Sequence, residues 1–314
     1  MIAKRAGTGR RSAMDKYLTR RIAAGILVCM KSGIKSGIFA TFALDGGEAH
    51  KTLTHLRELG YDCADLQTFV NTETEWFDLP SAERLRRWED VGKAARDCGI
   101  SFSQTHGPWR YPPRDSTEEE RAERFDKMAV ALEGTAAVGA PCMAIHNIMP
   151  FGVDVPPDPV RFMDMNREFF SRLLEKAKAA GVVIALENMP FKNLSLSTPE
   201  QVLNFAKEFD SPFFRICLDT GHAAVFGLSP ADAVRQIGKE YLACLHVHDN
   251  DGVHDRHWEP YRGVVDWADF SCALHEIGFD GSLSLETDVS RKLPASIRPE
   301  WEKALAATAR HLAM

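Results

Sequence analysis

Residues 180–188 read Ala-Gly-Val-Val-Ile-Ala-Leu-Glu-Asn. This stretch joins the end of a predicted helix to a predicted strand, and the prediction of the fold starts from this pair. Gly181 follows a long amphipathic segment, as expected where a left-handed residue ends a helix. The run Val182–Glu187 is short and continuously apolar before its last residue, which is typical of a strand buried on both faces. The stretch therefore predicts a helix that leads into a parallel strand, and the strand ends in a carboxylate.

The same alternation of short apolar runs and longer amphipathic segments continues through the chain from about residue 35. Strands are expected at Gly37–Ala43, Cys63–Phe69, Ile100–Thr105, Cys142–His146, Val182–Glu187, Phe214–Asp219, Leu242–His248 and Ser282–Glu286. Helices are expected at Glu48–Leu59, Ser81–Cys98, Thr117–Val138, Asp158–Ala180, Thr198–Glu208, Pro230–Glu240, Trp267–Ile277 and Pro299–Leu312. This repetition predicts a single-domain (β/α)8 TIM barrel. An open doubly wound sheet would normally have a Gly-rich phosphate turn after its first strand, and Asp45-Gly46-Gly47-Glu48 offers only a turn and a cap.

The charge and cysteine content exclude several classes of protein. The 314 residues include 38 Lys plus Arg and 44 Asp plus Glu, which gives a net charge of −6. Nine of the bases and one of the acids lie in residues 1–35, so the remainder carries a net charge of −14 and no nucleic-acid partner is expected. No apolar stretch is long enough to span a membrane. Seven cysteines without a Cys-x-x-Cys pair predict neither a zinc ribbon nor a disulfide scaffold, and favour a cytoplasmic location.

Residues 1–34 are predicted to be an N-terminal extension, disordered or accessory, to a barrel formed by residues 35–314. A basic stretch followed by the apolar run 22–30 has the outline of a secretory signal. No Ala-x-Ala-like cleavage site follows, and Lys31 and Lys35 close the run. An upstream extension of the reading frame, with the working start at Met14 or Met30, is the other interpretation.

Six consecutive predicted strands end in a histidine or a carboxylate, and the carboxyl ends of barrel strands form the active site. The residues are His106, His146, Glu187, Asp219, the pair His246 and His248, and Glu286. Three carboxylates brought together repel one another unless a cation offsets their charge. With one neutral imidazole they form an oxygen and nitrogen site that suits Mn²⁺, Co²⁺, Zn²⁺ or Mg²⁺. His246 and His248 have the same strand parity, so either one could be the imidazole ligand.

From about residue 37 to 312 the chain resembles the xylose isomerase-like TIM-barrel superfamily, which contains sugar (phosphate) isomerases and epimerases and the endonuclease IV branch. The motifs are Ala-Leu-Glu-Asn (185–188), Leu-Asp-Thr-Gly-His (218–222), Leu-His-Val-His-Asp-Asn-Asp-Gly (245–252), Asp-Arg-His (255–257), Gly-Val-Val-Asp-Trp (263–267) and Leu-Glu-Thr (285–287). The resemblance implies one divalent metal ion, with Mn²⁺ the first choice, bound by Glu187, Asp219, His246 and Glu286. An acid follows each histidine three residues later, Asp249 after His246 and Asp251 after His248, and the more usual alignment of His-x-x-Asp at the strand end favours His246.

The resemblance also implies an isomerase or epimerase of carbohydrate metabolism that acts on a small sugar or polyol. Glu187 and Glu286 would move a proton beside a carbonyl, through a metal-bound enediolate. The residues expected to contact the substrate are His106, Trp109, His146, Lys192, His222, His248, Asp255 and His257. Among them, Lys192 is the candidate for a carboxylate or phosphate group. A homo-oligomer is left open.

Two alternatives remain within the superfamily. Ketose 3-epimerases usually carry an Arg six residues after the metal-binding His and a Glu six residues after the first metal-binding Glu, and Gly252 and Asn193 stand at those positions here. Another keto sugar or a keto-inositol is therefore open as substrate, as is a lyase or dehydratase activity. An endonuclease IV-like activity is the second alternative, because the extra zinc ligands of that branch have counterparts of the right type. They are His106, His146, His222, Asp255 and His257. The acidic barrel disfavours a DNA substrate.

Overall fold

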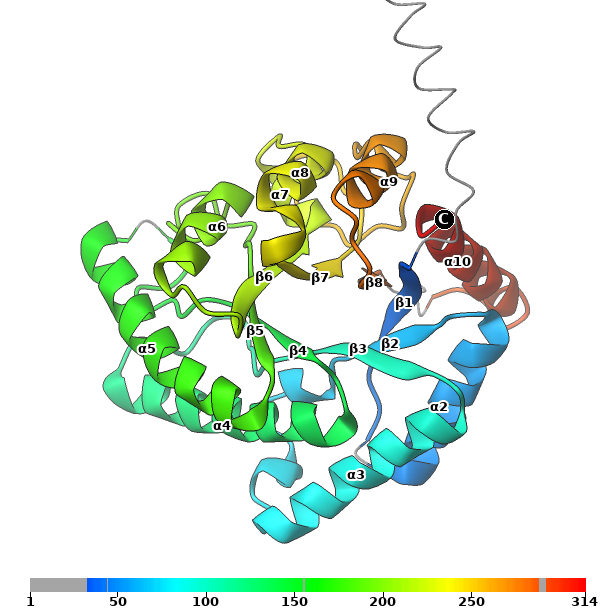
Figure 1. The fold of residues 1–314 in the computed structure, drawn as a ribbon, viewed down its shortest axis with the longest axis horizontal. Coiled ribbons are helices and arrows are strands. Elements are labelled where there is room, and N and C mark those ends of the chain that lie inside the picture. The colour runs from blue at the N-terminus through cyan, green and yellow to red at the C-terminus, as the bar shows by residue number, and fades with distance from the viewer. Residues whose placement is uncertain (1–32, 44, 155, 288–291) are drawn as a thin grey trace, which may run out of the picture.

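The structure is a computed structural model that describes residues 33–43, 45–154, 156–287 and 292–314. Most of the predicted N-terminal extension lies outside the described residues. Eight parallel strands form one sheet in the order β7-β6-β5-β4-β3-β2-β1-β8 (Figure 1). They are β1 (Lys35–Ala40), β2 (Cys63–Leu66), β3 (Ser101–His106), β4 (Cys142–Ile145), β5 (Val183–Glu187), β6 (Phe214–Asp219), β7 (Leu242–His246) and β8 (Ser282–Leu285).

The sheet closes on itself between β7 and β8. Val247 forms a parallel bridge with Leu285, and its N–H donates to the carbonyl of Ser284 at 2.9 Å. The N–H of Glu286 donates back to the carbonyl of Val247 at 3.0 Å. The predicted TIM barrel is therefore confirmed, and the closure lies beside two of the predicted metal ligands.

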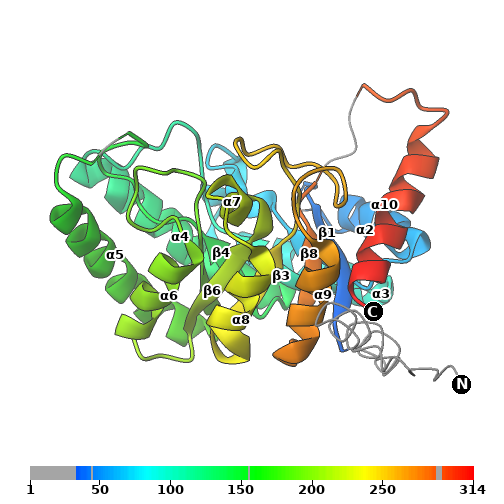
Figure 2. The same ribbon diagram turned by 90° about the horizontal axis from the view of Figure 1, so that it is seen from above.

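Helices surround the barrel (Figure 1), and Figure 2 shows the long loop after β7 at one end, above α9. They are α2 (Gly46–Leu59), α3 (Ser81–Asp97), α4 (Glu118–Val138), α5 (Pro159–Ala180), α6 (Pro199–Glu208), α7 (Thr220–Val225), α8 (Pro230–Tyr241), α9 (Trp267–Glu276) and α10 (Arg298–Leu312), with short 3-10 helices η1 (Thr68–Val70) and η2 (Glu75–Phe77). Thr117 and Thr198 form capping boxes at the start of α4 and α6. Gly181 ends α5 with φ of 69°, as predicted. Among the described residues, no helix has the length and apolar character of a membrane span.

Some element boundaries differ from the prediction. β7 ends at His246 rather than His248, because Val247 forms only the single bridge to Leu285 and Asp249 then exchanges two backbone hydrogen bonds with Trp258. β2 gives way to η1 three residues before its predicted end. Helix α7 was not predicted. It begins directly after β6 because the Asp219 carboxylate accepts a hydrogen bond from the His222 N–H at 2.6 Å and caps the helix.

The interior of the barrel has a layer of small side chains below the predicted site. Side chains alternate along a strand, so residues two apart face the same side. The interior layer contains the contacting residues Cys142, Ala144, Ala185, Cys217 and Cys244. His146, Glu187, Asp219 and His246 each lie two residues further along the same strands or just beyond them. The small layer therefore supports a set of polar side chains at the carboxyl end of the barrel.

Candidate functional site

Four side chains from the ends of neighbouring strands converge at the carboxyl end of the barrel. Glu187, Asp219, His246 and Glu286 each offer a ligand atom, and these atoms lie within 4.8 Å of one another. The side chains of Glu187, Asp219 and His246 are at most 1% exposed, and that of Glu286 is 15% exposed. The structure thus brings together the four residues that were predicted as metal ligands.

The contacts within this group are close but are not hydrogen bonds. Nδ1 of His246 lies 3.1 Å from Oε2 of Glu187 and 3.3 Å from Oε2 of Glu286. Among the described residues, neither Oε2 of Glu187 nor Nδ1 of His246 has a hydrogen-bond partner, although both atoms are buried. Buried polar atoms without partners are rare, because desolvation without compensation is unfavourable. The unpartnered atoms and the three-carboxylate, one-imidazole donor set both fit a divalent cation.

The histidines around the group lower the pKa values of two of its carboxylates, those of Glu187 and Asp219. Burial alone raises the pKa of Glu187, but the nearby His246 and His146 lower that pKa well below its usual range. Burial also raises the pKa of Asp219, and His222 and His248 lower it below its usual value. Ionised carboxylates are the form that binds a metal ion, so these two side chains carry charge that a cation would offset.

Three residues that sequence reasoning missed hold this group from the side of β2 and β3. Asp65 on β2 is fully buried, and its Oδ2 lies 3.2 Å from Nε2 of His246 and accepts a hydrogen bond from Gln104. Gln67 donates to Oε1 of Glu286 at 2.9 Å. The contact between Asp65 and His246 is an ion pair without hydrogen-bond geometry. A carboxylate at the far nitrogen of a histidine ligand still favours the ring orientation that leaves the other nitrogen for a metal. An acid inside a short apolar strand was the signal that could have identified Asp65.

A cavity of about 450 Å³ opens above the four-residue group. Its wall includes six of the residues predicted to contact a substrate: His106, Trp109, His146, His222, Asp255 and His257. Glu187 and Glu286 also line it. The volume is in the range of small-molecule sites.

Two predicted substrate contacts lie elsewhere. His248 is fully buried, with Nε2 3.0 Å from Oδ2 of Asp219. The side chain of Lys192 is exposed on the loop after β5 and is not part of the cavity wall. Phe191 lines the cavity instead, because the loop directs this aromatic ring inward and the next residue outward.

A second cluster, His222, His248, Asp255 and His257, borders the first, and its ligand atoms also lie within 4.8 Å of one another. Oδ2 of Asp255 lies 3.3 Å from Nε2 of His222 and 3.2 Å from Nε2 of His257. The Nδ1 atoms of His222 and His257 contact backbone carbonyls at 2.7 and 2.9 Å, which orients both rings. Burial lowers the pKa of His222, but Asp219 and Asp255 raise it to about 10. Without a cation this cluster is therefore a network of ion pairs.

The loop that carries Asp255 and His257 is organised by Asp249, which is fully buried. The Asp249 carboxylate accepts hydrogen bonds from three backbone N–H groups and from the indole of Trp267. The acid that follows His246 by three residues therefore anchors the loop and does not enter the cluster of ligand atoms. Gly221, in α7, leaves room for the ring of His248, because a Cβ atom at this position would lie 2.0 Å from Cε1 of that ring.

Comparisons with known proteins agree with this fold. A family model described as xylose isomerase-like TIM barrel matches residues 53–313. The D-psicose 3-epimerase of Enterocloster bolteae is 29% identical over 266 residues, which cover 81% of this chain and 82% of that enzyme. The protein MJ1311 of Methanocaldococcus jannaschii is 36% identical over 127 residues, and this match spans only 40% of this chain and 43% of that relative. The apo crystal structure of the 3-keto-D-glucoside 4-epimerase YcjR from E. coli has a similar fold, with a TM-score of 0.70 and 18% identity over 88% of this chain and 99% of that one.

Proposed function

Because the chain belongs to the xylose isomerase-like TIM barrel family, we propose that it is a divalent-metal-dependent sugar isomerase or epimerase. The observation that carries the proposal is the convergence of Glu187, Asp219, His246 and Glu286 beside a cavity of about 450 Å³, which Glu187 and Glu286 line. The relatives named D-psicose 3-epimerase and 3-keto-D-glucoside 4-epimerase support a sugar as the substrate.

The same four residues would hold the cation, with Mn²⁺ the first choice and Co²⁺, Mg²⁺ or Zn²⁺ as alternatives. When bound, a divalent ion supplies Lewis-acid chemistry that polarises a carbonyl and makes the neighbouring C–H bond more acidic. The buried, unpartnered Oε2 of Glu187 and Nδ1 of His246 support this assignment.

The chain's own residues supply the proton transfer. Glu187 and Glu286 both line the cavity, so a sugar bound there contacts both carboxylates. One carboxylate removes a proton from the carbon beside the carbonyl, and the other returns a proton. Gln67 donates to Oε1 of Glu286 and so orients this carboxylate. Trp109 provides an apolar ring for a sugar face, and the histidines of the wall bind hydroxyl groups.

The test is solvent deuterium exchange into ketoses, inososes and keto-glycosides with Mn²⁺ added. Glu286→Gln is expected to abolish exchange at the substrate carbon while circular dichroism keeps its helical signal. Glu168→Gln, which changes an exposed residue on α5, is the matched control and should exchange at the wild-type rate. Unchanged exchange in Glu286→Gln would remove this residue from the mechanism.

A lyase or dehydratase would begin with the same proton removal, so the products distinguish it from an epimerase. Loss of water lowers the mass of the sugar, whereas epimerisation leaves the mass unchanged and produces a second stereoisomer. The positions where ketose 3-epimerases usually have Arg and Glu are Gly252, which is in the loop after β7, and the exposed Asn193. A substrate other than a free ketose is therefore the stronger expectation.

One observation favours a second candidate, a hydrolase of phosphate esters that uses several metal ions. The cluster His222, His248, Asp255 and His257 could hold another cation beside the first site. Metal analysis of the loaded protein distinguishes the two functions. One equivalent of Mn²⁺, Co²⁺ or Mg²⁺ per chain supports the epimerase, whereas three tightly bound zinc ions and cleavage of DNA at an abasic site would support the nuclease.

We further propose that residues 1–34 are an accessory extension and that residues 35–314 form the functional barrel. Deletion of residues 1–29 should leave the melting temperature nearly unchanged, and a large fall would make the extension part of the fold. The cysteines among the described residues are all free thiols, which supports a cytoplasmic location.

A further inference from the structure

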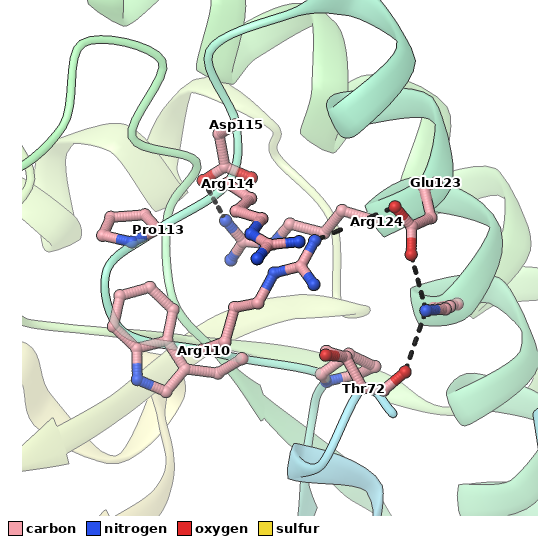
Figure 3. Close-up of a pocket in the computed structure, with 10 residues that line it drawn as sticks. Thr72, Arg110, Pro113, Arg114, Asp115, Glu123 and Arg124 are labelled. Atoms are coloured by element: carbon pink, nitrogen blue, oxygen red, sulfur yellow. Dashed lines mark hydrogen bonds and ion pairs between the residues drawn. The ribbon is translucent and has the colours of Figure 1, made fainter. Parts of the chain in front are cut away.

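Cationic side chains gather beside the cavity, on the outer side of the loop that follows β3. Arg110 and Arg114 come from this loop, and Arg124 and Lys127 come from α4. All four line one small pocket, where Figure 3 shows the three arginine side chains extending toward one another. Trp109 lines both this pocket and the larger cavity, so the two are neighbours with one wall residue in common.

Two of these four cations have dedicated partners. Arg124 pairs with the buried carboxylate of Asp115 and donates to the carbonyl of His146 at 2.8 Å. Lys127 pairs with Glu123 at 2.6 Å and donates to the carbonyl of Thr72 at 2.8 Å. These residues build the wall of the pocket and have little capacity left for a ligand.

The other two cations lack a partner of their own. Arg110 lies 3.8 Å from Glu123, the carboxylate that Lys127 already occupies. Arg114 is exposed and makes no ion pair within 4.0 Å among the described residues. The residues after 35 carry a net charge of −14, so a pocket with more cationic than anionic side chains is unusual for this barrel.

We propose that Arg110 and Arg114 bind an oxyanion, a phosphate or carboxylate group, and that the substrate carries this group. The second half of the proposal rests on the proposed function, because it requires a sugar in the adjacent cavity. A guanidinium group presents two parallel N–H donors that match the oxygen atoms of phosphate and carboxylate. Trp109 lies at the boundary, where it contacts the ring of His146 with centroids 4.5 Å apart. An anionic group beyond this ring would reach the arginines while the sugar remains above Glu187.

The two arginines take the role that the sequence predicted for a lysine in another loop. Lys192 was the predicted anion-binding residue, but it is exposed outside the cavity wall. The arginines line a pocket that shares a side chain with the cavity, and Tyr111, between Arg110 and Arg114 in the sequence, also lines the cavity. The site for the anion is therefore assigned to the loop after β3 and not to the loop after β5.

The experiment compares the full chain with the double variant Arg110→Gln/Arg114→Gln. The matched control is Arg86→Gln/Arg96→Gln, which removes the same charge from exposed positions on α3. Isothermal titration with inorganic phosphate measures anion binding directly and does not require turnover. Solvent deuterium exchange with matched phosphorylated, carboxylated and neutral sugars then gives KM and kcat.

The double variant should weaken phosphate binding by about tenfold or more and raise KM for anionic sugars by a similar factor, with little change in kcat. Neutral sugars and the α3 control should show wild-type values. Equal phosphate binding by the wild type and the double variant, or no binding by either, would overturn the anion site. If the double variant loses phosphate but keeps its KM for anionic sugars, the anion is a free ion and the substrate half is wrong. If no sugar exchanges deuterium, the proposed function fails, and the phosphate titration still decides the anion site.

Discussion

Asp249→Asn changes one atom of the residue that organises the loop after β7. Oδ1 of Asp249 accepts hydrogen bonds from the N–H groups of Asn250 at 2.9 Å and Val265 at 3.2 Å. Oδ2 accepts from the N–H of Gly263 and from the indole N–H of Trp267, both at 2.9 Å. An asparagine side chain keeps the shape but replaces one oxygen with an NH₂ group. Whichever way the amide turns, two of the four donors then face another donor.

The magnitude follows from these four bonds. A hydrogen bond to a charged group contributes about 1.5–3 kcal/mol, so losing two should lower the free energy of unfolding by about 3 kcal/mol or more. With an unfolding entropy of about 2.1 cal/mol/K per residue, each kcal/mol corresponds to about 1.5 °C in a chain of 314 residues, which predicts a fall in melting temperature of about 5 °C or more. The loop also carries Asp255 and His257, so catalysis and any second cation should be affected together.

Urea unfolding followed by circular dichroism measures the change. Asp251→Asn is the matched control, because Asp251 accepts backbone N–H groups two and three residues later but is partly exposed to water. Its substitution should lower the stability far less. A free energy of unfolding for Asp249→Asn within about 1 kcal/mol of the wild type would refute the view that this carboxylate holds the loop.

Three further predictions concern the site. Gly221→Ala should lower the free energy of unfolding by about 1–3 kcal/mol and weaken metal binding, because the added Cβ would collide with the ring of His248. The control Gly46→Ala meets only ordinary contacts and should be tolerated. Equal stability of the two variants in urea unfolding would contradict this prediction. Asp65→Asn should lower metal affinity about 10- to 100-fold in calorimetry, because His246 loses the carboxylate that orients it; an unchanged affinity would make the contact incidental. Chelation should lower the melting temperature, and a divalent ion at about 100 times its Kd should restore about 2.7 kcal/mol; a protein indifferent to both treatments would have no such site.

The fold was largely predictable because its signals are short in range. Thr117 and Thr198 cap their helices and Gly181 ends another, so the order of elements could be predicted from neighbouring residues. The convergence of strand-end residues then follows from the topology, because parallel strands bring their carboxyl ends to one side of a barrel. Both the barrel and the family were therefore predictable without any contact between distant residues being known.

The missed features depend on distant contacts or on the course of loops. Asp65 contacts His246 across the barrel, and nothing near Asp65 in the sequence indicates that partner. Periodicity does not determine how a loop turns, so it could not show that Phe191 faces the cavity and Lys192 faces solvent. The end of β7 was misplaced for the same reason, because a turn organised by Asp249 ends the strand early.

The closure between β7 and β8 also has a consequence for the order in which the molecule is assembled. β1 lies beside β8, with Lys35 opposite Ser282. The first strand can therefore form this pairing only after almost the whole chain has been synthesised. Glu286 follows this last strand directly. Contacts of such long sequence separation form late in folding. A nascent chain that lacks its last strand therefore has three of the four proposed ligands and an open wall, and only the final docking step completes both the barrel and the site.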